Sequence, residues 1–124
     1  MKSSRPMHLN LFQIRFPIMA IISILHRISG VLIFLALPIL LCLLSHSLSA
    51  QSGFSDTLQL CHSGFCKLFL WLVLVAVIYH LIAGCRHLIM DIGVGESIGA
   101  ARFTAIFVLA LVLILAIAAG VWIW

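Results

Sequence analysis

The chain has 124 residues, 65% of them hydrophobic and only 8% charged, and its mean hydropathy is +1.31. A soluble domain of this length needs more charge to cover its surface, so lipid is the natural solvent for most of the chain. The net charge of +4 comes from scattered basic residues that form no single patch, which argues against nucleic-acid binding. No room remains for a soluble catalytic domain, so partner chains must supply most of the machinery of any reaction.

Residues 1–16 are mixed and basic, and we expect them to form an arm at the membrane surface. The first apolar segment then runs from about residue 17 to 48, longer than the ~20 residues that cross a bilayer. Pro38 lies inside it and predicts a kink, which membrane helices tolerate. A polar connection, from about Ser49 to Gly64, ends this part of the chain.

The second apolar segment runs from about residue 65 to 90, and a short glycine-containing loop from Asp91 to Ala101 follows it. The third segment, residues 103–124, carries no charge and is the clearest transmembrane signal of the three. The sequence therefore predicts an all-α integral membrane protein, a single domain over residues 1–124 with three transmembrane helices.

The charges and tryptophans near the ends of the spans predict their orientation. Three basic residues precede the first span: Lys2, Arg5 and Arg15. The first loop holds only Asp56 and Lys67, so the positive-inside rule places the N-terminus in the cytoplasm and the C-terminus in the periplasm. The tryptophans then fall at the periplasmic interface, as expected of aromatic belts: Trp71, Trp122 and Trp124.

Polar residues interrupt the first span at Ser23, His26 and Arg27, whose i, i+3, i+4 spacing places them on one helix face. Arg27 lies about ten residues, or roughly 15 Å, beyond Pro17, which is deep for a side chain that snorkels to the headgroups. Snorkelling is the better explanation if the helix enters the membrane later, near Ile21. Spacing alone favours a buried functional cluster over snorkelling.

The second span carries His80, Gly84 and His87 at i, i+4 and i+7, again on one face. A histidine in the middle of a membrane span is either a structural residue bonded to a neighbouring helix or a ligand for haem iron. Gly84, one turn from His80, would leave space for a flat macrocycle. The residues alone leave both interpretations open.

Depth in the membrane connects the two clusters. The first span runs outward and the second returns, so Arg27 and the stretch from His80 to His87 occupy the same cytoplasmic half. A porphyrin bound to His80 would extend its propionates towards this side, where charge-assisted hydrogen bonds would stabilise them. The available partners are His26, Arg27, Arg86 and His87.

The four cysteines give no sign of covalently attached haem, because the chain has no C-x-x-C-H motif. Cys42 and Cys85 lie in apolar segments, where cysteine behaves as a small hydrophobe. Cys61 and Cys66 share a loop, and whether they pair stays open.

Two motifs resemble those of a known family. The stretch "SILHRISG", Ser23 to Gly30, and the stretch "HLIAGCRHLIMD", His80 to Asp91, are similar to signatures of the cytochrome b membrane-anchor subunit of bacterial succinate dehydrogenase. Arg5-Pro6, the three-span layout and the interval from Arg5 to Arg27 also fit. The resemblance thus covers essentially the whole chain, and Cys85, where the family commonly has an aliphatic residue, is a mild departure.

The resemblance implies roles for individual residues. His80 would be the axial ligand of haem b, within a two-chain helical bundle whose second small anchor subunit supplies the other ligand. Ser23 and Arg27 would form part of a ubiquinone site, and the propionates would lie near His26 and Arg27, with help from Arg86 and His87. Asp91 would have a structural role, in capping or in pairing with Arg86.

The resemblance also implies partners and a location. A flavoprotein subunit would oxidise succinate and an iron–sulfur subunit would carry the electrons, in the electron transport that links the tricarboxylic acid cycle to the inner membrane. Three alternatives remain: a haem-free structural anchor, a quinol:fumarate reductase anchor, and a small transporter half with a proton relay. The transporter is disfavoured because the spans contain no acidic residue apart from Asp91, which lies at a span boundary.

Overall fold

The computed structural model describes residues 17–124, which form four α-helices. They are α1 (Ile18–Ser49), α2 (Gln51–His62), α3 (Gly64–Asp91) and α4 (Ile98–Ile123). Of these, α1, α3 and α4 are long and apolar enough to cross a membrane. The prediction of an all-α protein with three spans is confirmed, whereas the arm predicted for residues 1–16 lies outside the described residues.

The polar connection predicted between the first two spans is largely a helix, α2. Extended backbone at Ala50 ends α1, and α2 then folds back beside the end of α1. The buried Gly53 permits this approach, because a Cβ there would collide with the carbonyl oxygen of His46 and lie 2.8 Å from Ser49 Oγ. Polar composition alone therefore did not predict that this segment is helical. The close contact of Gly53 with the end of α1 positions the helix.

The loop predicted from Asp91 to Ala101 is shorter in the structure, because α4 begins at Ile98. The side chain of Ser97 accepts a hydrogen bond from the backbone N–H of Ala100 and so caps the helix. Gly93 and Gly95 have φ angles of 83° and 79°, which turn the chain in a conformation that residues with a Cβ rarely adopt.

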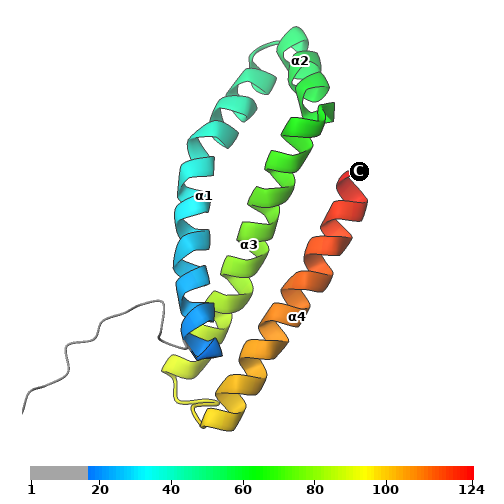
Figure 1. Cartoon of the computed structure of the whole chain (residues 1–124). Coiled ribbons are helices and arrows are strands. Elements are labelled where there is room, and N and C mark those ends of the chain that lie inside the picture. Colours follow the sequence, from blue (N-terminus) through cyan, green and yellow to red (C-terminus); the bar gives the residue numbers. More distant parts are fainter. Residues whose placement is uncertain (1–16) are drawn as a thin grey trace, which may run out of the picture.

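The three long helices lie side by side with α3 between α1 and α4, while α2 sits at one end of the bundle (Figure 1). Small residues dominate the buried seams, and within residues 17–124 only Ile22 among the large side chains is completely buried. Small residues allow helix backbones to approach closely, which replaces the hydrophobic drive that is absent between helices in lipid. All three helices meet in one cluster: Ile22, Tyr79, Ala83, Ala105, Val108 and Val112.

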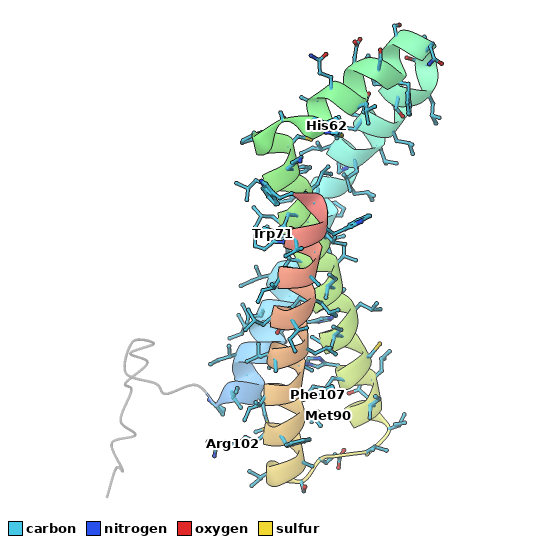
Figure 2. The ribbon with its side chains drawn as sticks, turned by 90° about the vertical axis from the view of Figure 1, so that its right-hand side faces the viewer. His62, Trp71, Met90, Arg102 and Phe107 are labelled. Atoms are coloured by element: carbon cyan, nitrogen blue, oxygen red, sulfur yellow. The ribbon has the colours of Figure 1, made fainter. Side chains whose placement is uncertain are left out.

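The start of α1 and the loop between α3 and α4 lie at the same end of the bundle, and α2 and the C-terminus lie at the other (Figure 1). Figure 2 shows Met90 and Arg102 near the first end and His62 near the second. The early part of α1 and the later part of α3 therefore lie in the same half of the bundle, as the sequence predicts.

Trp71, on α3, faces α4. Its Nε1–H donates to the carbonyl oxygen of Ala116 at 2.9 Å, and its ring lies against Gly120, where a Cβ would come within 3.3 Å of Nε1. Trp122 and Trp124, by contrast, are exposed. The role of Trp71 is therefore to join two helices, and its contact with the membrane interface stays a prediction.

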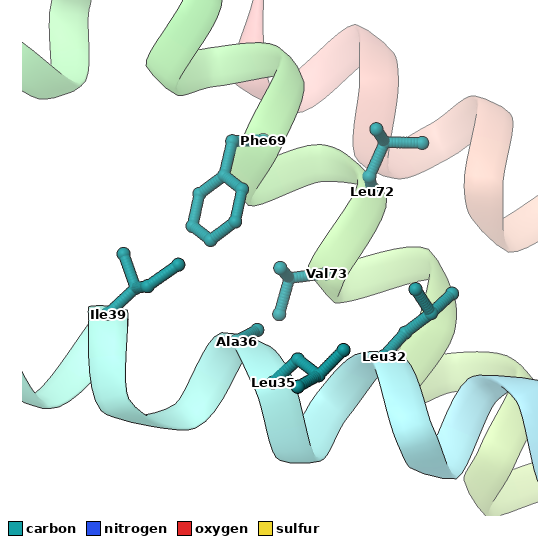
Figure 3. Close-up of a pocket in the computed structure, with 7 residues that line it drawn as sticks. All are labelled: Leu32, Leu35, Ala36, Ile39, Phe69, Leu72 and Val73. Atoms are coloured by element: carbon teal, nitrogen blue, oxygen red, sulfur yellow. The ribbon is translucent and has the colours of Figure 1, made fainter.

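An apolar cleft of about 290 Å³ separates α1 and α3 beyond the middle of the bundle (Figure 3). α1 continues through Pro38 as one helix and bends over towards α2 in its second half (Figure 1). Seven residues line the cleft: Leu32, Leu35, Ala36, Ile39, Phe69, Leu72 and Val73. α1 and α3 therefore leave a cleft between them in one half of the bundle and contact each other closely at the histidines in the other.

Cys61 lies in the last turn of α2 and Cys66 in the first turn of α3, so the two thiols face each other across the turn between these helices. Their sulfur atoms are 4.0 Å apart, and both cysteines are free thiols in the structure.

Candidate functional site

Three histidines from two helices form a stack between α1 and α3. The ring centroids of His26 and His80 are 4.0 Å apart with 14° between their planes. His87 lies on the other side of His26, at 5.2 Å and 28°. The two clusters recognised in the sequence are thus in direct contact.

A glycine on each helix allows this close approach. A Cβ at Gly30 would come within 3.0 Å of His80 Cε1, and one at Gly84 would come within 3.1 Å of His26 Nε2. The expectation that Gly84 leaves space for a macrocycle needs correction, because the His26 ring occupies that space. Each histidine instead lies against bare backbone of the facing helix.

The hydrogen bonds of His80 define its neutral tautomer. Its Nδ1 lies 3.1 Å from the carbonyl oxygen of His26 and 3.1 Å from Ser29 Oγ. A carbonyl oxygen can only accept, so Nδ1 must carry the hydrogen. Nε2 is then the unprotonated nitrogen, and its lone pair is available to a metal.

Ser29 and Tyr79 are buried polar residues that the sequence interpretation missed. Ser29 holds His80, and Tyr79 donates its hydroxyl hydrogen to the carbonyl oxygen of Ile22 at 2.9 Å, which joins α3 to α1. Ser29 lies three residues after His26 within the first motif, and this helical spacing was the available signal. Nothing in the sequence pointed to Tyr79, because its partner is a backbone carbonyl.

A shallow pocket of about 370 Å³ opens beside the histidines. It is lined by His26, His80, Leu81, Gly84, Cys85, His87 and Leu88. His87 Nδ1 donates to the carbonyl oxygen of Ala83 at 2.7 Å, whereas His26 Nε2 is buried without a hydrogen-bond partner in the described part of the chain. Three imidazole rings thus line the pocket within an apolar surround.

This arrangement fits a haem better than a bare metal ion. The stacked rings do not converge, and residues 17–124 contain no group of three or more His, Cys, Asp or Glu side chains that would hold an ion. Haem iron needs only one axial nitrogen from each side, because the porphyrin supplies the other four. His80 offers such a nitrogen, and the orphaned His26 Nε2 is a polar atom without a partner close by.

Ser23 and Arg27 share a face of α1 but do not line the histidine pocket. Ser23 is half-buried, one turn before the exposed Arg27. They lie in the sixth and tenth positions of α1, near the end that α1 shares with the loop between α3 and α4. The structure therefore leaves both side chains at the surface of this chain, where a ligand or partner can contact them.

Arg86, like Arg27, is an expected propionate partner that does not line the histidine pocket. Its Nε donates to Thr104 Oγ1 at 3.1 Å and its Nη2 donates to the carbonyl oxygen of Ala101 at 3.0 Å, both on α4. Each helical residue is rotated by about 100° from the one before it, so Arg86 and His87 face different neighbours. Arg86 thus bonds α4 rather than Asp91, which is exposed at the last position of α3.

These features define a class: a small multi-pass membrane subunit with a histidine site between two of its spans. Residues 1–119 match the family model described as succinate dehydrogenase/fumarate reductase transmembrane subunit, and the chain belongs to this family. Its relatives and its three apolar helices make it a multi-pass protein of the bacterial inner membrane.

Several curated relatives bear the name succinate dehydrogenase cytochrome b556 subunit. The protein from Coxiella burnetii is 43% identical over 125 aligned positions, which cover 100% of both chains. The protein from Rickettsia felis is 37% identical over 97 positions, 78% of this chain and 73% of the relative. That from Rickettsia typhi is 41% identical over 83 positions, 67% and 64% respectively.

Proposed function

We propose that this chain is the membrane-anchor cytochrome b subunit of a succinate dehydrogenase, that His80 ligates haem b, and that Ser23 and Arg27 form part of the ubiquinone-reduction site. The observation that carries the proposal is the orientation of His80. Two acceptors hold its Nδ1–H, and the ring borders an open apolar pocket. The names of the relatives, which include a b-type cytochrome, support the same assignment.

His80 would hold the haem iron through Nε2, and the bound haem would supply a one-electron redox centre. The ring of His80 is fixed before any ligand arrives, because Gly30 and His26 pack against it and two acceptors hold Nδ1–H. A fixed ring loses little conformational entropy on ligation, so the free energy of the metal bond is largely retained.

The propionates would be held by His26, Arg27 and His87. The two histidines flank each other in the stack, and His87 lines the pocket beside Leu88. Arg86 is left out of this proposal because its Nε and Nη2 donate to Thr104 and Ala101 on α4. A buried carboxylate needs a charged or hydrogen-bonding partner, and Arg27 is the remaining cation in this half of α1.

A second small anchor subunit would supply another ligand to the iron and cover the pocket. Leu81 and Leu88 line the pocket and are 64% and 67% exposed, so a facing helix would bury their side chains. A flavoprotein subunit and an iron–sulfur subunit would carry out succinate oxidation and electron transfer. This division of labour fits a chain whose described helices are mostly apolar.

Ser23 and Arg27 would act on the quinone itself. Ubiquinone takes up two electrons and two protons to become ubiquinol, and negative charge develops on its carbonyl oxygens during reduction. The Ser23 hydroxyl would donate a hydrogen bond to one carbonyl oxygen, and the Arg27 guanidinium would stabilise the charge that develops there. The half-buried and exposed positions of these side chains leave them accessible to such a substrate.

The family description covers fumarate reductase as well as succinate dehydrogenase. Succinate oxidation is favoured because the curated relatives named above are all subunits of succinate dehydrogenase. Comparing the rates of succinate oxidation with ubiquinone and fumarate reduction with a quinol in the purified complex distinguishes the two directions.

Replacing His80 by Leu in the whole complex tests the haem assignment. We expect loss of the six-coordinate low-spin signal in paramagnetic resonance and a changed reduced spectrum, because one axial nitrogen is removed. His62→Leu, at an exposed position in α2, is the matched control and should leave both signals unchanged. An unchanged bis-histidine signal in the His80 variant would contradict the assignment, and a complex without any haem in the wild type would favour a haem-free anchor.

A further inference from the structure

We propose that Ser29 is a positioning residue for His80: its buried hydroxyl oxygen accepts the Nδ1–H of the imidazole and so directs Nε2 towards the metal. The inference rests on the proposed role of His80 as a haem ligand, and it extends that site by a residue on the neighbouring helix.

The direction of this hydrogen bond follows from the single hydrogen of the serine hydroxyl. Ser29 Oγ lies 2.7 Å from the carbonyl oxygen of His26, a distance typical of a strong O–H···O bond. A carbonyl cannot donate, so the hydroxyl hydrogen points at His26 and is no longer available to His80. Oγ must therefore accept from His80 Nδ1, 3.1 Å away.

The same carbonyl oxygen of His26 lies 3.1 Å from His80 Nδ1, so the two acceptors share one N–H. The three groups form a closed arrangement in which Ser29 bonds both the carbonyl and the imidazole. A half-turn of the ring would remove Nδ1–H from both acceptors. Because an unpaired polar group inside a membrane is costly, this arrangement opposes such a rotation.

Burial makes the contact effective. Ser29 is only 5% exposed, so water does not compete for its oxygen. The adjacent Gly30 lies against the same ring, where a Cβ would come within 3.0 Å of His80 Cε1. Successive residues of α1 thus fix the position of the His80 ring and the direction of its nitrogens.

A hydrogen bond to the distal N–H of a ligating imidazole makes the other nitrogen more basic. A more basic nitrogen stabilises ferric over ferrous haem and lowers the reduction potential. Removing the acceptor should therefore raise the potential. Loss of a hydrogen-bond partner of a metal-ligating residue typically lowers metal affinity 10- to 100-fold. A tenfold loss confined to the ferric state corresponds to a rise of about 59 mV in the reduction potential.

The test uses the full complex with Ser29→Ala, Ser29→Thr and Ser47→Ala. Ser47 is the matched control because its Oγ donates to the carbonyl oxygen of Leu44 at 2.9 Å, the same i−3 bond on the same helix, without the imidazole contact found at Ser29. The measurements are the haem midpoint potential, the low-spin paramagnetic resonance spectrum and the haem retained after detergent dilution. Subunit content of the purified complex shows whether each variant assembles.

We expect Ser29→Ala to raise the midpoint potential, shift the low-spin resonance and retain less haem, with assembly intact. Ser29→Thr, which keeps a hydroxyl able to bond the preceding turn, should restore the wild-type potential. Ser47→Ala should match the wild type throughout. A wild-type potential and resonance in Ser29→Ala would overturn the inference, as would an equal shift in Ser47→Ala.

The two proposals fail differently. If His80→Leu abolishes the six-coordinate signal while Ser29→Ala leaves the haem unchanged, His80 is the ligand and Ser29 does not position it. If His80→Leu leaves the haem unchanged, the ligand assignment fails and the inference about Ser29 fails with it. Should Ser29→Ala fail to assemble, the haem potentials of Ser29→Thr and Ser29→Cys are compared. A higher potential in Ser29→Cys, whose thiol is the weaker acceptor, supports the inference, and identical potentials in the two variants overturn it.

Discussion

At the scale of single residues, the first motif uses neighbouring positions for different tasks. His26 and Ser29 face α3 and belong to the histidine site, whereas Ser23 and Arg27 stay outside that pocket. Ser23 lies one turn before Arg27 on a face that this chain leaves half-buried or exposed. A hydroxyl and a fixed cation one turn apart suit a carbonyl group that is first bound and then gains negative charge.

Ser23→Ala should lower the rate of ubiquinone reduction by roughly 100-fold, because removing one preorganised donor typically costs this much. Succinate oxidation with a soluble acceptor that takes electrons upstream should persist. The two rates are measured on the same purified complex. Ser47→Ala, which removes a hydroxyl from the same helix at the other end, is the control. Wild-type turnover and quinone affinity in Ser23→Ala would place the pocket elsewhere.

At the scale of helices, α3 is joined to α4 by polar contacts near both ends. Arg86 bonds Thr104 and the carbonyl oxygen of Ala101 near the loop, and Trp71 bonds the carbonyl oxygen of Ala116 towards the far end. Thr104 also donates to Ala101 O, so the arginine completes a small network. The contacts define which face of α4 packs against α3, since apolar packing in lipid is weakly directional.

Arg86→Leu should destabilise the bundle by about 1 kcal/mol and leave the haem potential unchanged, because hydrogen bonds between membrane helices contribute about 0.6 kcal/mol on average and up to about 1.7. Thermal unfolding of the purified complex measures the first effect and a redox titration the second. Arg102→Leu, at an exposed position on α4, should change neither. A shifted haem potential in Arg86→Leu would instead indicate that Arg86 binds a haem propionate.

At the scale of the whole molecule, the three spans place the proposed quinone and haem residues in one half of the bundle. The start of α1, with Ser23, and the end of α3, with His87, lie towards the loop between α3 and α4 (Figure 1). Electrons from soluble subunits would have to arrive at this end. The function therefore depends on which side of the membrane the end faces.

Alkaline phosphatase fused after Trp124 should be active and a fusion after Gly95 inactive, because the positive-inside rule places the N-terminus in the cytoplasm. A third fusion after Ser63, between α2 and α3, should be active, since Figure 1 places that turn at the same end as the C-terminus. Phosphatase activity in whole cells is the measurement. The reverse pattern would place the proposed quinone residues on the periplasmic side.

Hydropathy and motif spacing predicted the three spans, because a segment that cannot be hydrated must form a helix and about twenty residues cross the bilayer. The second span was predicted within one residue at each end, whereas α4 starts five residues earlier than predicted because Ser97 caps it. The opposite directions of the first two spans also indicated that Arg27 and the stretch from His80 to His87 share one half of the membrane. These features are local, so the sequence alone determined them.

Only the tertiary structure decided which polar groups meet. Depth in the membrane assigned Arg86 and His87 to the same candidate site, but a 100° step around α3 turns Arg86 to α4 and leaves His87 with His26. Gly84 suggested space for a macrocycle, and the structure fills that space with the His26 ring. Ser29 and Tyr79 each donate a hydrogen bond to a backbone carbonyl oxygen, that of His26 and that of Ile22. Every residue has such a carbonyl, so residue types do not reveal which one is bonded. The close approach of the helix backbones determines it.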